Sequence, residues 1–145
     1  MKKSAWFLLL AVVLTAGCSD VVTSRYKTYN DAASDGLFGR GWLPEIIPQS
    51  SYDIVTSNDL DLNISHGEFS FNLEEKDLFQ SMLKPYRGRK TPFLNYKKVV
   101  KDRESQGYIA FEYSANKCVW IFYINEKTGH VYYDLWLEHN SASKK

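Results

Sequence analysis

Cys118-Val119-Trp120-Ile121-Phe122-Tyr123-Ile124 is the apolar run on which the fold prediction depends. Side chains alternate between the two faces of a strand, so a run that is apolar at every position predicts a strand covered on both sides. The segment Glu126-Lys127-Thr128-Gly129 follows it and has the composition of a hairpin loop, in which Gly129 can take the left-handed conformation. Residues 130–138 then predict the returning strand.

The segments before this run extend the same pattern. Residues 108–113 alternate in polarity and predict a strand, and Ser114-Ala115-Asn116-Lys117 predicts the turn that joins it to the apolar run. Residues 94–101 are interpreted as one more strand, although their spacing also fits a helix. Together these segments predict an antiparallel meander in the C-terminal half.

The N-terminal half predicts two helices and two strands. Thr28 with Asp31 forms a capping-box pattern, which places a short helix at about residues 29–36. Apolar side chains recur at helical spacing after Asn72, which predicts the principal helix at about residues 73–86. Alternation within residues 52–63 and 68–73 predicts strands. We therefore predict a single α+β domain over residues 25–140, an antiparallel sheet packed with these helices, followed by a polar tail at 141–145.

The first 17 residues have the composition of a signal peptide. Lys2 and Lys3 precede a mostly apolar segment at residues 5–16, which is shorter than the about 20 residues that a membrane-spanning helix needs. An ordinary secretory signal is the alternative, but Leu14-Thr15-Ala16-Gly17-Cys18 resembles the end of a bacterial lipoprotein signal. In that class the cysteine thiol receives a diacylglycerol, the leader is cut before it, and the new amine is acylated.

This resemblance implies a signal peptide at residues 1–17, lipidation of Cys18 and a lipidated tether at residues 18–24. Ser19 follows the cysteine, as in lipoproteins of the outer membrane. We therefore predict attachment to the outer membrane on its periplasmic side if the host is Gram-negative. A lipidated Cys18 forms no disulfide, so Cys118 is expected to be a free thiol within the core.

Charge is distributed unevenly between the two halves of the mature chain. Residues 18–83 carry 4 basic and 11 acidic side chains, whereas residues 84–145 carry 12 basic and 6 acidic ones. The halves can attract each other within the fold, or they can give the surface a dipole that steers a partner.

Two segments supply candidate contact residues. Gly36-Leu37-Phe38-Gly39-Arg40-Gly41-Trp42-Leu43-Pro44 is too rich in Gly and Pro for a regular helix, so Arg40 and Trp42 lie on an ordered loop. Trp42 is either an interface anchor or a plug that seals the core. The basic stretch around Arg87 and Arg89 is either a solvated face or a contact for anionic head groups or an acidic partner. Nucleic acid is not expected as a partner of an exported lipoprotein.

The sequence predicts no catalytic residue, no metal site and no cofactor. Asp59-Leu60-Asp61-Leu62-Asn63 matches the start of a calcium loop, but Ile64 and Ser70 replace the required Gly and Glu. His66, His130 and His139 lack metal-ligand spacing.

The motif series in the first half resembles a known family. It includes Tyr26, Asp31-Ala32, Gly36-Leu37, Arg40-Gly41-Trp42-Leu43-Pro44, Ile47-Pro48, Asp53-Ile54, Asn58, Phe69 and Phe71. This series is similar to small bacterial envelope proteins with a YbbD-type head domain. The resemblance implies an envelope setting and assigns no catalytic residue, because that family has no established activity.

These observations favour a membrane-anchored envelope lipoprotein that binds another envelope protein without catalysis. It would hold, inhibit or scaffold that protein, and an immunity-type inhibitor is one version. A cell-wall-directed hydrolase is the alternative, for which a pocket converging on Asp53, Asp59, Asp61 or Arg40 would be evidence. A lipid or ligand carrier is a further alternative, and it would need an apolar cavity open to solvent.

Overall fold

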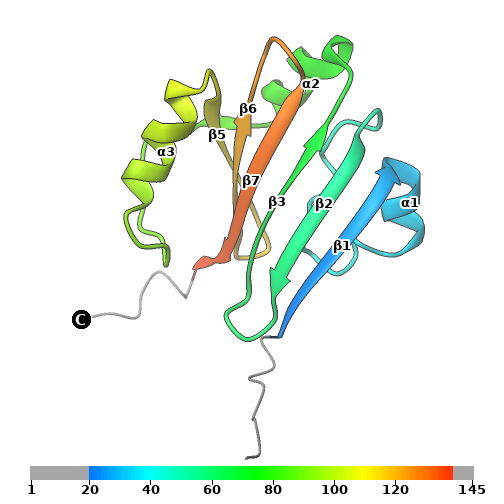
Figure 1. The fold of residues 1–145 in the computed structure, drawn as a ribbon, viewed down its shortest axis with the longest axis horizontal. Helices are drawn as coiled ribbons and strands as arrows, with labels where there is room; N and C mark the ends of the chain where they lie inside the picture. Colours follow the sequence, from blue (N-terminus) through cyan, green and yellow to red (C-terminus); the bar gives the residue numbers. More distant parts are fainter. Residues whose placement is uncertain (1–19, 139–145) are drawn as a thin grey trace, which may run out of the picture.

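The computed structural model describes residues 20–138 of the chain. The predicted signal peptide, the lipidation site Cys18 and the polar tail at 141–145 lie outside these residues. Seven strands form one antiparallel sheet in the order β1-β2-β3-β7-β6-β5-β4 (Figure 1). The strands are β1 (Val21–Thr28), β2 (Tyr52–Asp59), β3 (Ile64–Ser70), β4 (Lys84–Pro85), β5 (Ile109–Ala115), β6 (Cys118–Ile124) and β7 (His130–Leu137). The predicted α+β class and the C-terminal meander β5-β6-β7 are confirmed.

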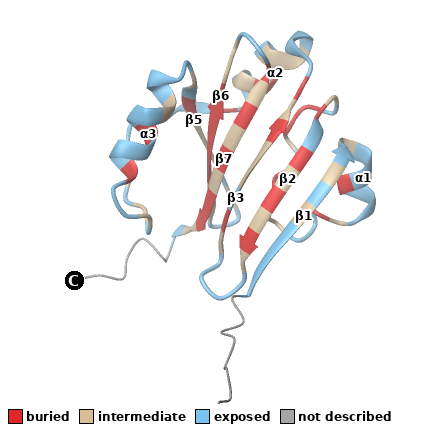
Figure 2. Cartoon of the chain, viewed as in Figure 1, coloured by how far each residue is buried: buried red, intermediate tan, exposed pale blue. Residues whose placement is uncertain are grey.

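Strand β6 is the most thoroughly buried strand, as its composition predicts. Six of its seven residues are buried, and it lies between β5 and β7 (Figure 2). The turn to β7 has Gly129 in the left-handed region, with φ of 74°. Both faces of this part of the sheet are therefore covered, and each face carries its own hydrophobic cluster.

The first face of the sheet packs against the N-terminal helix, the loop at residues 35–51 and α2. Helix α1 (Tyr29–Ser34) begins with the predicted capping box between Thr28 and Asp31. Phe69, Phe79 and Phe122 form edge contacts between the sheet and α2, with ring centroids 5.4 to 6.3 Å apart. These rings form the centre of the larger core.

The principal helix is shorter than predicted. The 3-10 turn η1 (Leu73–Glu75) and helix α2 (Lys76–Ser81) replace the helix expected at 73–86, and β4 follows at Lys84–Pro85. Asn72 caps η1 as predicted, by accepting from the backbone N–H of Glu74 at 3.3 Å. The Glu75 carboxylate instead accepts from the N–H of Ser50 at 3.0 Å and so ties the helix to the preceding loop.

The strand predicted at residues 94–101 is wrong. This segment begins α3 (Tyr96–Ser105), the longest helix among the described residues. Tyr96 and Val100 are buried one helical turn apart, and both pack against the second face of the sheet. Helix α3 stands over the β5-β6-β7 side of this face, whereas β1, β2 and β3 lie beyond it (Figure 1).

The predicted tether is also too long. Val21 to Ser24 belong to β1, which pairs with β2 from Val21↔Asp59 to Thr28↔Tyr52. The polar composition of this segment suggested a linker because β1 is an edge strand with most of its side chains exposed. The folded domain therefore begins three residues after Cys18. No helix within residues 20–138 has the length and apolar character to span a membrane.

Candidate functional site

The predicted contact residues of the N-terminal loop have partners within the fold. Trp42 is half-buried against the core, and its carbonyl accepts a hydrogen bond from Nε1 of Trp120 at 3.3 Å. Arg40 pairs with Asp35 at 2.8 Å and also donates to the hydroxyl of Tyr26 at 3.2 Å. The hydrogen bonds from Tyr26 and Arg40 lower the pKa of Asp35. This geometry favours the interpretation of Trp42 as a plug.

The two arginines of the basic stretch differ in their surroundings. Arg89 donates to Glu112 at 2.6 Å and to Glu138 at 2.7 Å, which ties the segment after β4 to the sheet. Arg87 is exposed. Of the two, Arg87 is the side chain that is open to solvent.

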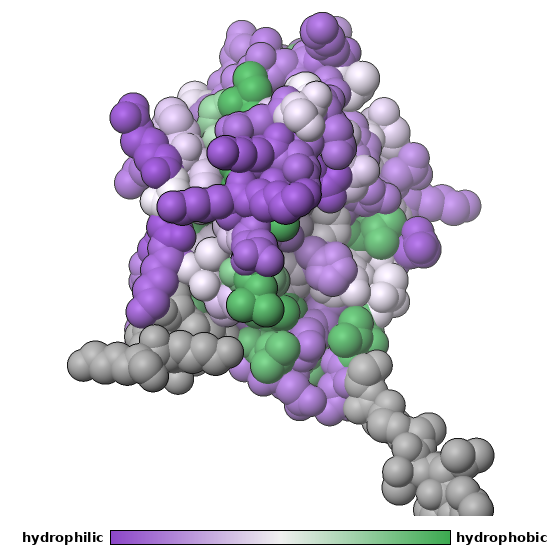
Figure 3. All heavy atoms as spheres, turned by 60° about the vertical axis from the view of Figure 1, so that its left-hand side comes forward, coloured by the Kyte–Doolittle hydropathy of each residue, from purple (hydrophilic) through white to green (hydrophobic). Residues whose placement is uncertain are grey.

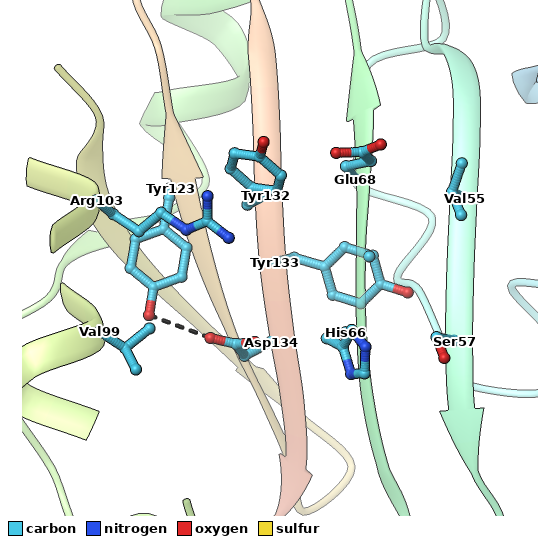
Figure 4. A pocket seen from close by; sticks show the side chains of 11 residues that line it. Val55, Ser57, His66, Glu68, Val99, Arg103, Tyr123, Tyr132, Tyr133 and Asp134 are labelled. Carbon is cyan, nitrogen blue, oxygen red and sulfur yellow. Dashed lines mark hydrogen bonds between the residues drawn. The ribbon is translucent and has the colours of Figure 1, made fainter. Parts of the chain in front are cut away.

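A groove lies beside α3, where the second face of the sheet is no longer covered by this helix. Its volume is about 320 Å³, and it lies between α3 and the second faces of β2, β3 and β7 (Figure 4). Residues of five elements meet there, because the antiparallel register places β3 directly beside β7. The lining side chains are Val55, Ser57, His66, Glu68, Val99, Arg103, Tyr123, Tyr132, Tyr133 and Asp134.

Asp134 is a half-buried carboxyl group in the lining of this groove. Tyr96 donates to its Oδ2 at 2.7 Å and Tyr123 donates to the same oxygen at 3.1 Å. Within residues 20–138, Oδ1 receives no side-chain hydrogen bond. Burial raises the pKa of Asp134, and burial likewise raises the pKa values of the two tyrosines. Both tyrosines therefore stay protonated. Tyr96 donates to Asp134, whereas the single proton of the Tyr123 hydroxyl is shared between Asp134 and the Tyr96 hydroxyl, which lies 2.8 Å away.

Arg103 and Glu68 place opposite charges on either side of Tyr132. The Arg103 guanidinium lies 3.5 Å from the centroid of the Tyr132 ring, a cation–π contact. Glu68 pairs with Tyr132 across β3 and β7. His66 is exposed and lies opposite Asp134 in the same ladder. The groove thus offers two carboxylates, one guanidinium and an imidazole around an aromatic floor.

A hydroxyl, an imidazole and a carboxylate follow one another at the upper end of the groove. The hydroxyl of Tyr108 lies 3.1 Å from Nδ1 of His130, whose Nε2 lies 3.6 Å from Glu68. Burial lowers the pKa of His130 and raises that of Tyr108. The phenol therefore remains protonated, and this arrangement does not activate it as a nucleophile. His130, expected to be solvated from its place after the hairpin turn, is half-buried.

The residues named for a hydrolase do not converge on this groove. Asp59 is the last residue of β2 and Asp61 lies in the turn that follows, whereas Arg40 lies on the loop against the first face. Asp53 lines a neighbouring hollow with Arg25 and Lys27. Among residues 20–138, no group of three or more His, Cys, Asp or Glu side chains is placed to hold a metal ion.

Ionisation of Asp134 is expected to cost stability. The pKa of Asp134 is raised in the folded state, so the folded chain binds this proton more tightly than the unfolded chain does. The stability that the protonated carboxyl contributes is therefore fully present below about pH 4 and is lost as pH rises through the folded-state pKa. Asparagine does not ionise, so the Asp134→Asn variant does not lose this stability as pH rises. We expect its free energy of unfolding, relative to wild type, to rise between pH 4 and pH 7.

Urea unfolding at a series of pH values measures this difference. Asp61→Asn, at an exposed turn, is the matched control and should show a smaller pH dependence relative to wild type. A wild-type minus Asp134→Asn difference that is independent of pH would show that burial does not disfavour the carboxylate.

The fold and the groove define an α+β domain on an open antiparallel sheet with a solvent-accessible groove between α3 and the strands. Residues 20–70 match the family model of the YbbD head domain, so the chain contains a YbbD-type head domain. This confirms the resemblance of the motif series and points to an envelope-associated family, with no activity attached to it. No curated protein and no solved structure gives a significant match.

The matched region ends with β3 and divides the groove. Glu68 and His66 lie within residues 20–70, whereas Asp134 and Arg103 come from β7 and α3. The groove is therefore formed jointly by the head domain and the segment that follows it.

Sequence analysis missed the groove residues, although part of the signal was present. In β3, His66 and Glu68 share one parity, opposite to that of the buried Phe69. This parity predicts that both face away from the main core. The pairing of β3 with β7, which brings them to Asp134, is a contact between distant segments and has no local signal.

Proposed function

We propose that the protein is a lipid-anchored envelope lipoprotein that binds another envelope protein without catalysis. In this proposal Cys18 holds it at the outer membrane facing the periplasm, and the groove takes side chains of the partner. The single observation that carries the binding role is the half-buried Asp134 carboxylate in the groove lining, whose Oδ1 accepts no side-chain hydrogen bond within residues 20–138.

Charge complementarity selects a basic side chain as the occupant. A lysine or arginine reaching Asp134 would form a charge-assisted hydrogen bond in a partly desolvated setting, where such bonds are strong. Glu68 adds a second carboxylate, and Arg103 is held against Tyr132. We therefore propose that the partner presents a segment with a basic side chain followed by apolar or hydroxyl groups.

The size of the groove supports individual side chains as occupants. Its volume of about 320 Å³ is at the lower end of the range for small-molecule sites, about 300–1,000 Å³. A carrier of long acyl chains would need an apolar cavity without charges, whereas this groove carries Asp134, Glu68, Arg103 and His66 among its aromatic and valine side chains. Binding of a partner segment agrees better with this lining.

Crosslinking in cells tests the binding role. A photoreactive amino acid at His66 should give a specific crosslinked protein, and Asp134→Asn should reduce its yield about tenfold because the buried charge pair is lost. A probe at Arg87 tests the exposed basic stretch as a second contact.

The control probe replaces Glu74, which is exposed on η1, away from the groove. A probe at His66 that captures no specific protein, or the same products from Glu74 as from His66, would contradict the proposal. If Asp134→Asn leaves the crosslink yield unchanged, the protein has a partner, but the Asp134 carboxylate does not contribute to recognising it.

A further inference from the structure

Apolar side chains gather at the end of the sheet where β1 begins. Leu60 and Leu62 are 48% and 58% exposed in the turn between β2 and β3, and Leu94 is 85% exposed in the segment before α3. Val21 and Val22, at the start of β1, are 43% and 48% exposed. In Figure 3, green side chains gather in the lower part of the molecule. We call these five residues the apolar end.

The three segments that form the apolar end are held together by the fold. The backbone N–H of Leu60 donates to the carbonyl of Asp20 at 3.1 Å, which fixes the turn beside the start of β1. Phe93 contacts Trp136, with centroids 5.8 Å apart, and Trp136 pairs with Ile64 immediately after the turn. These contacts place the three segments at the same end of the sheet.

The turn keeps its leucines at the tip by local hydrogen bonds. Oδ1 of Asp59 accepts from the backbone N–H groups of Asp61 and Leu62, at 3.1 and 2.9 Å. Asn63 takes the left-handed conformation, with φ of 50°, and returns the chain to β3. Asp59 thus shapes the turn, and its carboxylate is engaged by backbone donors.

The position of Cys18 identifies the surface that this end meets. Cys18 lies three residues before Val21, so at full extension the two are about 10 Å apart. We propose that the apolar end rests on the membrane to which Cys18 is attached, and this inference depends on the lipid anchor of the proposed function. Exposed hydrophobic patches on soluble domains mark interaction surfaces, and apolar side chains bind at the boundary between head groups and acyl chains.

The charges near the apolar end limit the depth of this contact. Asp61 lies between the two leucines and is exposed, so the turn reaches the interface but does not enter the hydrocarbon core. Lys97 and Lys98 are exposed in the first turn of α3, close in sequence to Leu94. Lys98 pairs with Asp102 at 2.6 Å, whereas the long side chain of Lys97 can reach lipid phosphates while Leu94 contacts the acyl boundary.

This arrangement orients the groove. The strands run from the apolar end toward the β6–β7 turn, and α3 runs beside them (Figure 1). With the apolar end on the membrane, the strands stand upright and the groove opens sideways. A partner segment would then approach parallel to the membrane surface.

Quenching by labelled lipids tests the contact on the full acylated protein. In a Cys118→Ala background, Leu62→Cys and Leu94→Cys are labelled with an environment-sensitive fluorophore and reconstituted into phosphatidylethanolamine–phosphatidylglycerol vesicles. Doxyl groups near the head group should reduce both signals about twofold or more. Lys127→Cys, exposed at the opposite end, is the control and should not be quenched.

The outcomes separate this inference from the anchor. Protein that does not float with the vesicles overturns the anchor, and the membrane contact with it. Protein that floats with unquenched labels at positions 62 and 94 overturns the membrane contact alone. A blue shift without lipid quenching would place these positions against protein, such as a second copy, and would also overturn it. Circular dichroism and thermal unfolding establish that each variant is folded.

Discussion

Gly67→Ala is expected to destabilise the fold by about 3 kcal/mol or more. A Cβ at this position would lie 2.0 Å from the carbonyl oxygen of Val55 and 2.8 Å from the Tyr133 ring. The first contact is with backbone of the neighbouring strand, so relief requires β2 and β3 to separate. Tyr133 cannot move freely either, because its hydroxyl lies 3.1 Å from Oγ of Ser65 in the core. Overpacking of this kind usually costs about 1–3 kcal/mol, and a backbone clash lies at the upper end or beyond.

Thermal and urea unfolding measure this effect, with a fall in Tm of more than about 10 °C expected. Gly39→Ala is the matched control, because its Cβ would meet no atom closer than 3.7 Å. Crosslinking from His66 should also be lost in Gly67→Ala, since β2 and β3 form one wall of the groove. Equal stability of the two alanine variants would show that the Val55 carbonyl of β2 does not lie as close to Gly67 of β3 as the structure places it.

The central strand could be predicted because its signal is local, whereas α3 could not. Residues 118–124 are apolar at every position, which few arrangements other than a doubly covered strand satisfy. Residues 94–101 combine β-branched Val99 and Val100 with a spacing that also fits a helix. The choice is made by tertiary packing, since Tyr96 contacts Trp136 with centroids 5.7 Å apart and hydrogen-bonds to Asp134. Both partners lie about 40 residues away in sequence.

The candidate site depends even more on distant contacts. Arg40 and Trp42 were predicted contact residues because arginine and tryptophan are frequent in interfaces. In the structure, however, Arg40 pairs with Asp35, and the Trp42 carbonyl accepts a hydrogen bond from Trp120. Asp134 has no distinguishing neighbour in sequence. Its significance arises from burial beside two tyrosine hydroxyls of α3 and β6, which only the folded chain brings together.

Cys18→Ser is expected to move the protein from the membrane fraction to the soluble fraction almost completely. Serine cannot form the thioether on which acylation depends, so the acyl chains are lost together. Each buried methylene contributes about 0.8 kcal/mol, and stable attachment requires two such signals, which the acylated cysteine exceeds. The apolar end has two leucines at its tip with Asp61 between them, so its contact alone is too weak to retain the protein.

Cys118→Ser makes the same chemical change at the second cysteine and is the matched control for this experiment. Cys118 is half-buried against the larger core, and burial raises the pKa of its thiol, so it serves as a packing residue. The control should stay with the membrane in high salt, and mass spectrometry of the wild-type N-terminus should find Cys18 acylated. Retention of Cys18→Ser on membranes in high salt would contradict the lipid anchor. It would also mean that the folded domain, and the apolar end in particular, is sufficient for attachment, because salt screens exposed charges and leaves apolar contacts in place.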